Sequence, residues 1–524
     1  PMSDMFSFLK GIPSKGIPFK PRVPQESLYQ KDAINDYEYE FRDAHSVSKT
    51  TKIPLTCANM ACGSGKTYGG GMIAKGRLAN NTIDGVVIVV PNDMIAMQWK
   101  KDCYNALGLE LLLSKDPQKD LKSSTSAGII VTYAWLSMRS TDGVYYNAEL
   151  LLKHFKDKRL LIVLDEVHHI CKAFDRAWSE GVKYLAYRAA KVKGSRVLSM
   201  TGTAFRSDEW GVLFFRMRKN DQGESVIWPH YTFTLFESIK MGHARMPVFP
   251  TFTADMSFIR RGVDFTGKTF GEKLDASVLR AMTEPGSPAY YKMLDMCVEN
   301  YQSLKASITA FHPAFCCFVP PLRPGQDESD ALILKTNEYL KKHHNLLGYS
   351  IGKRSPENND IFDRLELKQA PSPDFLVSNF KMGEGISYNN TIMTCSLTNI
   401  VAELYDYQCW GRAWRLIFAA CQAGRQSMHW ITGHPVLVAA SESVLGDIAR
   451  CMKELTADEL RDFANGAGSG SGNGNGNGNG NGNNTDDTFK VTGGTNIGLQ
   501  SWRSPSEKAL MDKVHKLGGD DAGK

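Results

Sequence analysis

The chain has 524 residues, 42% of them hydrophobic and 23% charged, and its 62 basic and 56 acidic residues leave a net charge of +6. This length predicts two or three domains with apolar cores, and the small net charge permits nucleic acid as a partner without indicating one. The 11 cysteines form no Cys-x-x-Cys pair, so neither a zinc site nor a disulfide framework is indicated.

The hydropathy of the chain gives no indication of a membrane protein. No apolar run approaches the length of a membrane span, and the first residues lack the continuous apolar core of a signal peptide. We therefore expect an intracellular protein that has no membrane as a partner.

The first α/β region covers residues 50–205, where short runs rich in β-branched residues alternate with longer, helix-compatible stretches. Such apolar runs are typical of strands that are buried on both faces of a parallel sheet. The predicted strands are 55–59, 85–91, 127–136, 159–166 and 195–203.

A glycine-rich stretch, MACGSGKTYGG at residues 60–70, lies between the first of these strands and a predicted helix. On its own the string is equally typical of an ordinary turn, and Met60 stands where a strict phosphate loop has glycine. The strand-loop-helix context favours a phosphate site, because backbone N–H groups, one cation and one hydroxyl together suit a phosphate and its Mg²⁺. The residues predicted to bind the nucleotide here are Gly63, Ser64, Gly65, Lys66 and Thr67, with Thr67 also on Mg²⁺.

Two acidic residues, Asp165 and Glu166, end the strand LLIVLDE and are followed by Val167 and His168. In isolation, adjacent carboxylates are typical of a solvated strand end. After five apolar residues, and in the same predicted sheet as a phosphate loop, they favour a catalytic site. We expect Asp165 to hold Mg²⁺ through water and Glu166 to polarise the attacking water.

A second α/β region comes later in the chain, with predicted strands 314–322, 374–380 and 391–397 and helices 328–343 and 401–419. The stretch between the two regions, 209–304, has a less regular pattern. The predicted domains are an N-terminal lobe over 1–225, a connecting region over 226–304 and a C-terminal lobe over 305–464.

The C-terminal part differs in composition. Residues 465–484, a Gly/Asn-rich run, cannot pack a core, so we expect a flexible linker with a root-mean-square span of roughly 25 Å. The tail, residues 485–524, contains Trp502 and an amphipathic helix predicted over 504–517. This segment either docks on a partner protein or on another surface of this chain, or is a tail without a role.

With these motifs in order, the chain resembles a superfamily 2 DExH-box helicase or translocase: Asp165, Glu166, Val167 and His168 match the DExH box. LYQKDAI (28–34), VVPNDMIAMQW (89–99), VTYAWL (131–136), MTGTAFRSD (200–208), SNFKMGEGIS (378–387) and QCWGRAWR (408–415) resemble the other motifs of that family. The resemblance covers about residues 25–420. MTGTAFRSD and DEVHH are closer to the restriction-motor and repair branch than to the RNA-unwinding DEAD-box branch, which favours DNA.

The resemblance implies an α/β fold with two tandem RecA-like lobes, each on a parallel sheet, and ATP with Mg²⁺ in the cleft between them. It also implies roles for single residues: Gln30 reads adenine, Gly385 belongs to the second lobe's part of the nucleotide site, and Gln408 positions water. Arg412 and Arg415, three residues apart, would share a helix face and stabilise charge on the phosphate. An arginine pair at this spacing is otherwise typical of a solvated helix face. Met60, Cys62 and Ala204 depart from the family pattern.

The function implied is an ATP-dependent helicase or translocase on nucleic acid, with DNA favoured over RNA. Two alternatives stay open: the motor subunit of a restriction or defence complex, and a nucleic-acid clamp that binds ATP without productive turnover. Intact Lys66, Asp165, Glu166 and Arg415 argue against the clamp.

Overall fold

The computed structural model divides into two compact units, Pro1–Ser238 and Ile239–Lys524. The described residues are 22–42, 50–61, 63–113, 120–121, 126–172, 176–202, 211–219, 221, 223, 225–234, 237–238, 241, 250–260, 263–268, 287–306, 308, 311–319, 329–352, 361–366, 368–378, 388, 390–397, 436–437 and 489–501. Within these ranges, no helix has the length and apolar content needed to cross a membrane.

The first unit is built on a seven-stranded sheet in the order β1-β2-β6-β5-β3-β4, with β9 also pairing with β2. All neighbouring pairs are parallel except β1 with β2. The strands are β1 (Glu38–Arg42), β2 (Thr50–Met60), β3 (Gly85–Val90), β4 (Gly128–Thr132), β5 (Leu160–Asp165), β6 (Arg196–Thr201) and β9 (Tyr231–Phe233). The predicted parallel sheet of an α/β fold is therefore confirmed. This arrangement is that of a RecA-like lobe.

One strand is shorter than predicted. The run 127–136 was expected to be a single strand, but β4 ends at Thr132 and the short helix α6 (Tyr133–Leu136) comes next. The Thr132 side chain accepts a hydrogen bond from Trp135 N (3.1 Å), so it caps this helix. Apolar residues continue from β4 into α6, so the sequence alone could not distinguish the strand from the helix.

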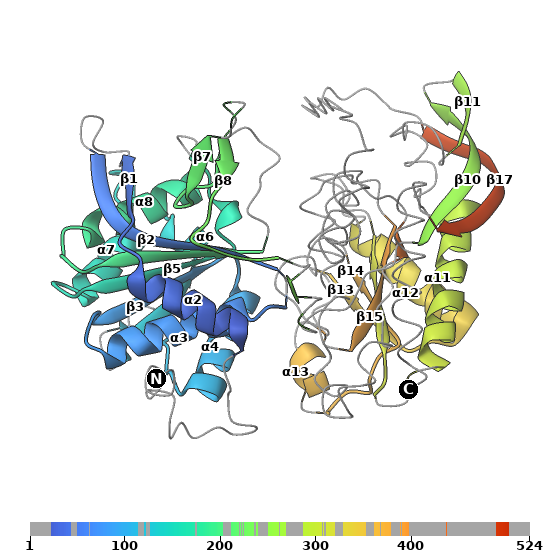
Figure 1. Ribbon diagram of the computed structural model, residues 1–524. Coiled ribbons are helices and arrows are strands. Elements are labelled where there is room, and N and C mark those ends of the chain that lie inside the picture. The colour runs from blue at the N-terminus through green and yellow to red at the C-terminus, as the bar shows by residue number, and fades with distance from the viewer. Residues whose placement is uncertain are drawn as a thin grey trace, which may run out of the picture. The chain divides into compact units, whose positions relative to one another are not determined.

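Helices cover both faces of this sheet (Figure 1). The helices α2 (Val23–Ile34), α3 (Lys66–Ala79) and α4 (Asp93–Leu107) pack on one face, together with strand residues such as Leu161 and Val163. On the other face lie α6, α7 (Tyr146–His154) and α8 (Ala177–Ala189), with Ile162 and Leu164. Alternate residues of β5 thus enter two separate cores, which explains why the strand is apolar at every position.

Two small elements complete the described part of this unit. The strands β7 (Met217–Lys219) and β8 (Ser225–Ile227) form an antiparallel pair apart from the main sheet. A 3₁₀ turn, η2 (Val167–His169), follows β5 after the single residue Glu166. The end of β5 therefore leads straight into the predicted acidic motif.

The second unit contains an eight-stranded sheet in the order β11-β10-β16-β15-β12-β14-β13, with β17 also pairing with β10. The five strands from β16 to β13 are parallel. The elements are β10 (Pro250–Arg260), β11 (Val263–Lys268), α11 (Pro288–Ala306), β12 (Ala314–Phe318), α12 (Ser329–His344), β13 (Gly348–Ile351), α13 (Ile361–Glu366), β14 (Phe375–Ser378), β15 (Thr391–Ser396), β16 (Val436–Leu437) and β17 (Phe489–Ser501). The sheet is again predominantly parallel, as predicted for the second RecA-like lobe.

The core of this unit lies between its sheet and the helices α11 and α12, which contribute residues such as Met293, Cys297 and Ile333 to one cluster with β12, β14 and β15. The long helix α11 lies largely within the stretch 209–304, for which the sequence pattern is less regular, and ends at Ala306. It packs as a core helix of the second unit. The predicted helix 401–419 lies outside the described residues.

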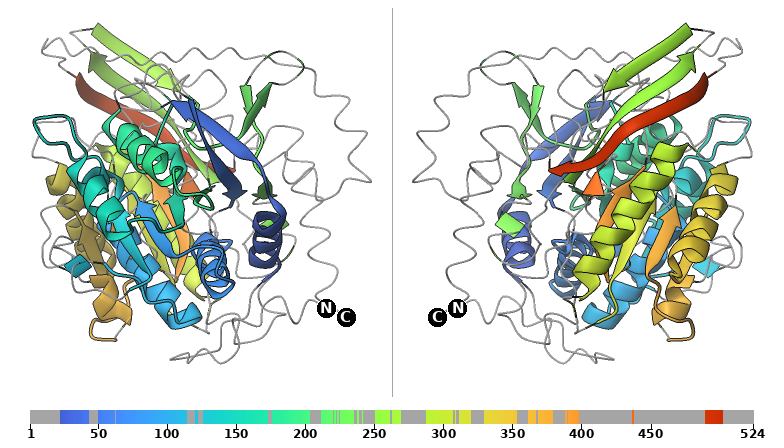
Figure 2. Two further views of the ribbon diagram at one scale, coloured as in Figure 1. Left: turned by 90° about the vertical axis from the view of Figure 1, so that its left-hand side faces the viewer. Right: turned by 90° about the vertical axis from the view of Figure 1, so that its right-hand side faces the viewer.

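The tail contributes a strand that the sequence did not predict. β17 pairs antiparallel with β10 from Pro250↔Ser501 to Arg260↔Phe489, with two register shifts, and Figure 2 shows this red strand alongside β10 and α11. The linker at 465–484 and the predicted helix at 504–517, as well as Trp502, lie outside the described residues.

Candidate functional site

The glycine-rich stretch forms the turn between β2 and α3 that the sequence predicted. Gly63 and Gly65 have φ angles of +80° and +85°. Side-chain-bearing residues rarely adopt this left-handed region, so both glycines are required by the backbone path. Lys66 then opens α3, whose N-terminus presents backbone N–H groups and partial positive charge toward an anion.

The Lys66 ammonium lies between this turn and the acidic pair. Its Nζ atom donates to Met60 O (3.3 Å) and forms an ion pair with Glu166 Oε1 at 3.4 Å. The Lys66 side chain is only 12% exposed and that of Glu166 24%. A charge at this depth is stabilised by its partner, so the two motifs form one electrostatic site.

Asp165 is the last residue of β5, and both of its carboxylate oxygens are held. Trp99 Nε1 of α4 donates to Oδ2 (2.7 Å), and the backbone N–H of Glu166 donates to Oδ1 (3.0 Å). The hydroxyl of Tyr133 in α6 donates to the Asp165 carbonyl (2.9 Å). Helices on both faces of the sheet therefore fix the position of this residue.

Glu166 has a left-handed backbone, with φ of +47°, which turns the chain sharply after β5. Thr201, at the end of β6, donates from Oγ1 to Glu166 Oε2 (3.1 Å). The hydroxyl oxygen then accepts from His168 Nδ1, 2.9 Å away, and the same ring nitrogen lies 3.4 Å from Glu166 Oε2. His168 is buried, so this small network connects the acidic motif to the start of the Thr-Gly-Thr motif.

The two carboxylates differ in the direction in which their pKa is shifted. Burial, reinforced by the negative charge of Glu166, raises the pKa of Asp165 above its ordinary value. Burial also acts to raise the pKa of Glu166, but Lys66 and His168 outweigh it and hold that pKa well below the ordinary value. Asp165 is thus the carboxylate that a further cation would stabilise most.

Two features of the site fit a nucleotide with Mg²⁺. The hydroxyl of Ser64 is buried and has no hydrogen-bond partner within the described part of the chain, which is costly unless a ligand supplies one. Among the described residues, no cluster of three His, Cys, Asp or Glu side chains could hold a metal by itself. Mg²⁺ is commonly held by one or two side chains together with substrate phosphates, and the two predicted ligands, Thr67 in α3 and Asp165, carry oxygen atoms of this kind.

The structure thus brings together Gly63, Ser64, Gly65, Lys66 and Thr67 in one turn, and it places Lys66 against Glu166, with Asp165 and His168 adjacent. Gln30 lies on α2 and is partly buried. The predicted second-lobe residues Gly385, Gln408, Arg412 and Arg415 lie outside the described residues, as do Cys62 and Ala204.

Four side chains around the site were not singled out from the sequence: Gln25, Trp99, Tyr133 and Thr201. The Gln25 amide, on α2, donates from Nε2 to Ser64 O (2.6 Å). Trp99, Tyr133 and Thr201 lie within motifs that the sequence did indicate. Gln25 lies outside those motifs, and no spacing pattern relates it to a turn 39 residues further on.

Residues 25–206 match the family "Type III restriction enzyme, res subunit" (ResIII). An uncharacterized protein of Mycobacterium tuberculosis (strain ATCC 25618 / H37Rv) is 28% identical over 217 residues, which are 41% of this chain and 33% of that protein. A second, of Mycobacterium leprae (strain TN), is 25% identical over 215 residues, again 41% and 33%. The match therefore spans about a third of the length of these relatives.

Among solved structures, the Mycobacterium smegmatis helicase Lhr, bound to single-stranded DNA and AMP-PNP, aligns with a TM-score of 0.48 at 13% identity, over 84% of this chain and 48% of that one. A fragment described as an HsdR subunit of a type I restriction enzyme from Vibrio vulnificus YJ016 aligns with a TM-score of 0.47 at 15% identity, over 83% and 66%.

Proposed function

We propose that this protein couples ATP hydrolysis to movement along nucleic acid. The proposal rests on the resemblance to superfamily 2 motors of the restriction type, which the family match over residues 25–206 supports. The observation that carries the proposal is the Lys66–Glu166 ion pair at 3.4 Å, which joins the phosphate loop to the acidic motif. A motor needs both parts in one place, because binding a phosphate without activating water gives no turnover.

The residues of the first unit have distinct roles in this proposal. The amides around Gly63 to Lys66 bind the phosphates, the Lys66 ammonium neutralises their charge, and Asp165 with Thr67 holds Mg²⁺. Bound Mg²⁺ would neutralise charge on the phosphates during transfer. Glu166 orients water and accepts its proton. A bound phosphate competes for Lys66, and losing that neighbour would raise the pKa of Glu166 and make it a better base.

The second lobe would supply the remaining groups. By resemblance, Arg415 and Arg412 place positive charge on the transferring phosphate, Gln408 positions water and Gly385 lines the site, while Gln30, on α2 of the first unit, reads adenine. An arginine of this kind acts chiefly in the transition state. Arg415→Ala should therefore abolish hydrolysis while nucleotide affinity stays within roughly tenfold of the wild type.

The substrate we propose is DNA, contacted mainly through its phosphates and therefore without sequence preference. A second candidate is a motor subunit of a restriction or defence complex, which the match to the res subunit family favours. The two differ in partners: the second requires nuclease or methylase proteins that copurify with the chain.

The experiment is ATP turnover measured without nucleic acid and then with single-stranded DNA, duplex DNA, forked DNA and RNA. Wild-type turnover should rise with DNA. Glu166→Gln should bind ATP but lose roughly 10² to 10³ in turnover, the usual cost of removing one group that acts in the transition state. Lys66→Ala should weaken ATP binding itself. Glu110→Gln, an exposed site outside the motif, is the matched control.

The outcomes separate the alternatives. ATP binding without turnover in the wild type supports the clamp and contradicts the motor. Stimulation by RNA alone contradicts the DNA assignment. Glu166→Gln with turnover within twofold of the wild type removes Glu166 from its role.

A further inference from the structure

Gln25 is a buried side chain, only 3% exposed, whose two polar atoms are both used. Its Oε1 atom accepts from the backbone N–H of Arg22 (2.8 Å), closing the N-terminus of α2. Its Nε2 atom donates to the carbonyl of Ser64 (2.6 Å) in the phosphate loop. Hydrogen bonds at both the oxygen and the nitrogen define the orientation of the Gln25 amide, and this amide in turn holds the Ser64 carbonyl.

The Ser64 carbonyl belongs to the same peptide group as the Gly65 N–H. In a planar trans peptide the C=O and N–H bonds point in opposite directions. A carbonyl held against α2 therefore directs the Gly65 N–H away from α2. In a glycine-rich turn, such amides form the concave surface that binds an anion.

Gly65 shows how closely Gln25 approaches this turn. A Cβ atom added to Gly65 would lie 2.2 Å from Gln25 Nε2, far inside van der Waals contact. The space that a side chain would fill is occupied by the Gln25 amide. Glycine is thus required at position 65 for two reasons: the φ angle of +85°, and the close approach of the Gln25 amide to the backbone.

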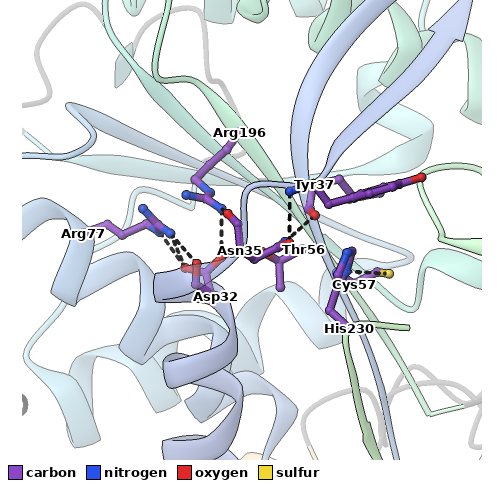
Figure 3. A network of polar contacts seen from close by, with 9 residues as sticks. Asp32, Asn35, Tyr37, Thr56, Cys57, Arg77, Arg196 and His230 are labelled. Carbon is purple, nitrogen blue, oxygen red and sulfur yellow. Dashed lines mark hydrogen bonds and ion pairs between the residues drawn. The ribbon is translucent and has the colours of Figure 1, made fainter. Parts of the chain in front are cut away.

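The helix that carries Gln25 is fixed at its other end by the buried carboxylate of Asp32 (Figure 3). Arg77, in the last turn of α3, donates from Nε to Asp32 Oδ2 (2.6 Å), and Thr56 of β2 donates to Oδ1 (2.7 Å). Arg196, at the start of β6, forms an ion pair with the same carboxylate at 3.5 Å. A group can orient another only if its own support is rigid, and α2 is attached to α3 and to the sheet.

We infer that Gln25 is a positioning residue for phosphate binding: it holds the Ser64–Gly65 peptide so that the Gly65 N–H faces the phosphate. The inference rests on the proposed function for the identity of the ligand, a nucleoside diphosphate or triphosphate. It differs from the role that the resemblance gives to Gln30, which concerns the base. Gln25 acts on the phosphates, through the backbone of the loop.

The test is direct binding of ADP and of adenosine in EDTA, so that no metal or turnover contributes. Gln25→Glu keeps an acceptor for Arg22 N and suits the first turn of a helix, but cannot donate to Ser64. Gln25→Met removes the donor to Ser64 and also the acceptor for Arg22 N, without adding charge. Both should bind ADP roughly three- to tenfold more weakly, the effect of one lost hydrogen bond, with adenosine affinity unchanged. Lys31→Ala, exposed on the same helix, is the control and should match the wild type.

A second readout is hydrogen exchange of the peptide that spans residues 60–67, without nucleotide. Exchange in the loop should accelerate in Gln25→Met while exchange in the central strands β3 and β5 stays unchanged. The inference is overturned if Gln25→Met binds ADP as the wild type does, or if ADP and adenosine weaken equally, since the latter indicates a general loss of α2. Failure of the wild type to bind ADP would instead contradict the proposed function.

Discussion

The indole of Trp99 lies where α4 meets the acidic motif, and it is among the largest fully buried side chains of the described residues. Its Nε1–H binds Asp165 Oδ2 at 2.7 Å. A buried carboxylate needs such a partner, because its charged form is otherwise poorly solvated. The donor thus opposes the burial that raises the pKa of Asp165.

Trp99→Phe keeps most of the apolar volume and removes this donor. If Asp165 holds Mg²⁺ as proposed, its charged form becomes harder to maintain, so the Mg²⁺ concentration for half-maximal ATP turnover should rise severalfold. Turnover at saturating Mg²⁺ should recover most of its wild-type value. A thermal unfolding curve recorded beside the titration measures the packing loss of about 1–3 kcal/mol separately. An unchanged Mg²⁺ requirement would show that the indole serves packing alone.

His230 gives a prediction about pH. Burial, with a smaller contribution from Arg216, lowers the pKa of His230 to about 4, against an opposing effect of Asp32. Its Nδ1 atom accepts from the backbone N–H of Cys57 in β2 (3.0 Å), which requires the neutral ring (Figure 3). In the unfolded chain His230 takes up a proton near pH 6.5, whereas in the folded chain it does so only near pH 4. The contribution of the neutral His230 ring to the free energy of unfolding is therefore fully present above pH 6.5 and decreases as the pH falls from 6.5 to 4.

The comparison of the wild type with His230→Asn isolates this effect. The wild type should unfold at a higher temperature at pH 7.5, and the difference between the two proteins should shrink as the pH falls toward 4.5. Other groups that titrate over this range are common to both proteins and cancel in the difference. A difference that is the same at every pH would contradict the role given to the ring.

At the scale of elements, α3 is unusual because it contains Gly69, Gly70, Gly71 and Gly76. Glycine inside a helix costs about 1 kcal/mol relative to alanine, so the sequence KTYGGGMIAKG alone disfavours a stable helix. The structure gives the reason. A Cβ atom on Gly70 would lie 2.7 Å from both Trp99 Cη2 and Met200 Cε, and the other three face Leu28, Leu107 and Tyr29 at 2.6–3.0 Å. Close packing of the neighbouring helices requires these glycines.

Gly70→Ala is therefore expected to destabilise the protein although alanine favours helix. The gain in helix propensity is about 1 kcal/mol, whereas overpacking a core costs typically 1–3 kcal/mol, and here the displaced group is the Trp99 ring. We expect a lower unfolding midpoint in urea. A Gly70→Ala protein of higher stability would mean that Trp99 and Met200 can move aside at little cost.

Only some strands of each sheet could be predicted from the sequence: β2 to β6 of the first unit and β12, β14 and β15 of the second. A strand buried on both faces leaves an uninterrupted apolar run, as in LLIVLD, whereas the other strands of the two sheets were not indicated. The Lys66 turn and the Asp165–Glu166 pair were likewise visible, since each combines residue types that a plain core does not use. Gln25 was not visible: its role depends on a contact across 39 residues of sequence, for which a single chain carries no periodic signal. The strand-to-helix change at Thr132 was also missed, because apolar residues continue from β4 into α6.

At the scale of the whole molecule, the C-terminal tail returns to the sheet of the second unit. β17 pairs with β10 along its length, on the edge of β10 opposite to β11 and β16. Apolar residues alternate with polar residues or glycine at the two ends of β17: Phe489 and Val491, then Ile497 and Leu499. This alternation is typical of a strand, but glycines interrupt it in the middle. The Gly/Asn-rich composition of residues 465–484 predicts a flexible linker with a root-mean-square span of roughly 25 Å. A linker of this kind allows β17 to pair with β10.

Two truncations distinguish the strand β17 from the residues on its C-terminal side. Removing 485–524 deletes β17 and leaves one edge of β10 without a partner, whereas removing 503–524 keeps the strand. Only the first truncation should accelerate hydrogen exchange in residues 250–260 and promote self-association at high concentration, since an unpaired edge strand exposes backbone groups that other chains can bind.

Both truncations should keep basal ATP turnover, because neither removes a residue of the proposed site. Loss of nucleic-acid or partner binding in both truncations to the same extent would assign that role to the predicted helix at 504–517, which both remove. Equal exchange of residues 250–260 in both truncations would contradict the pairing of β17 with β10.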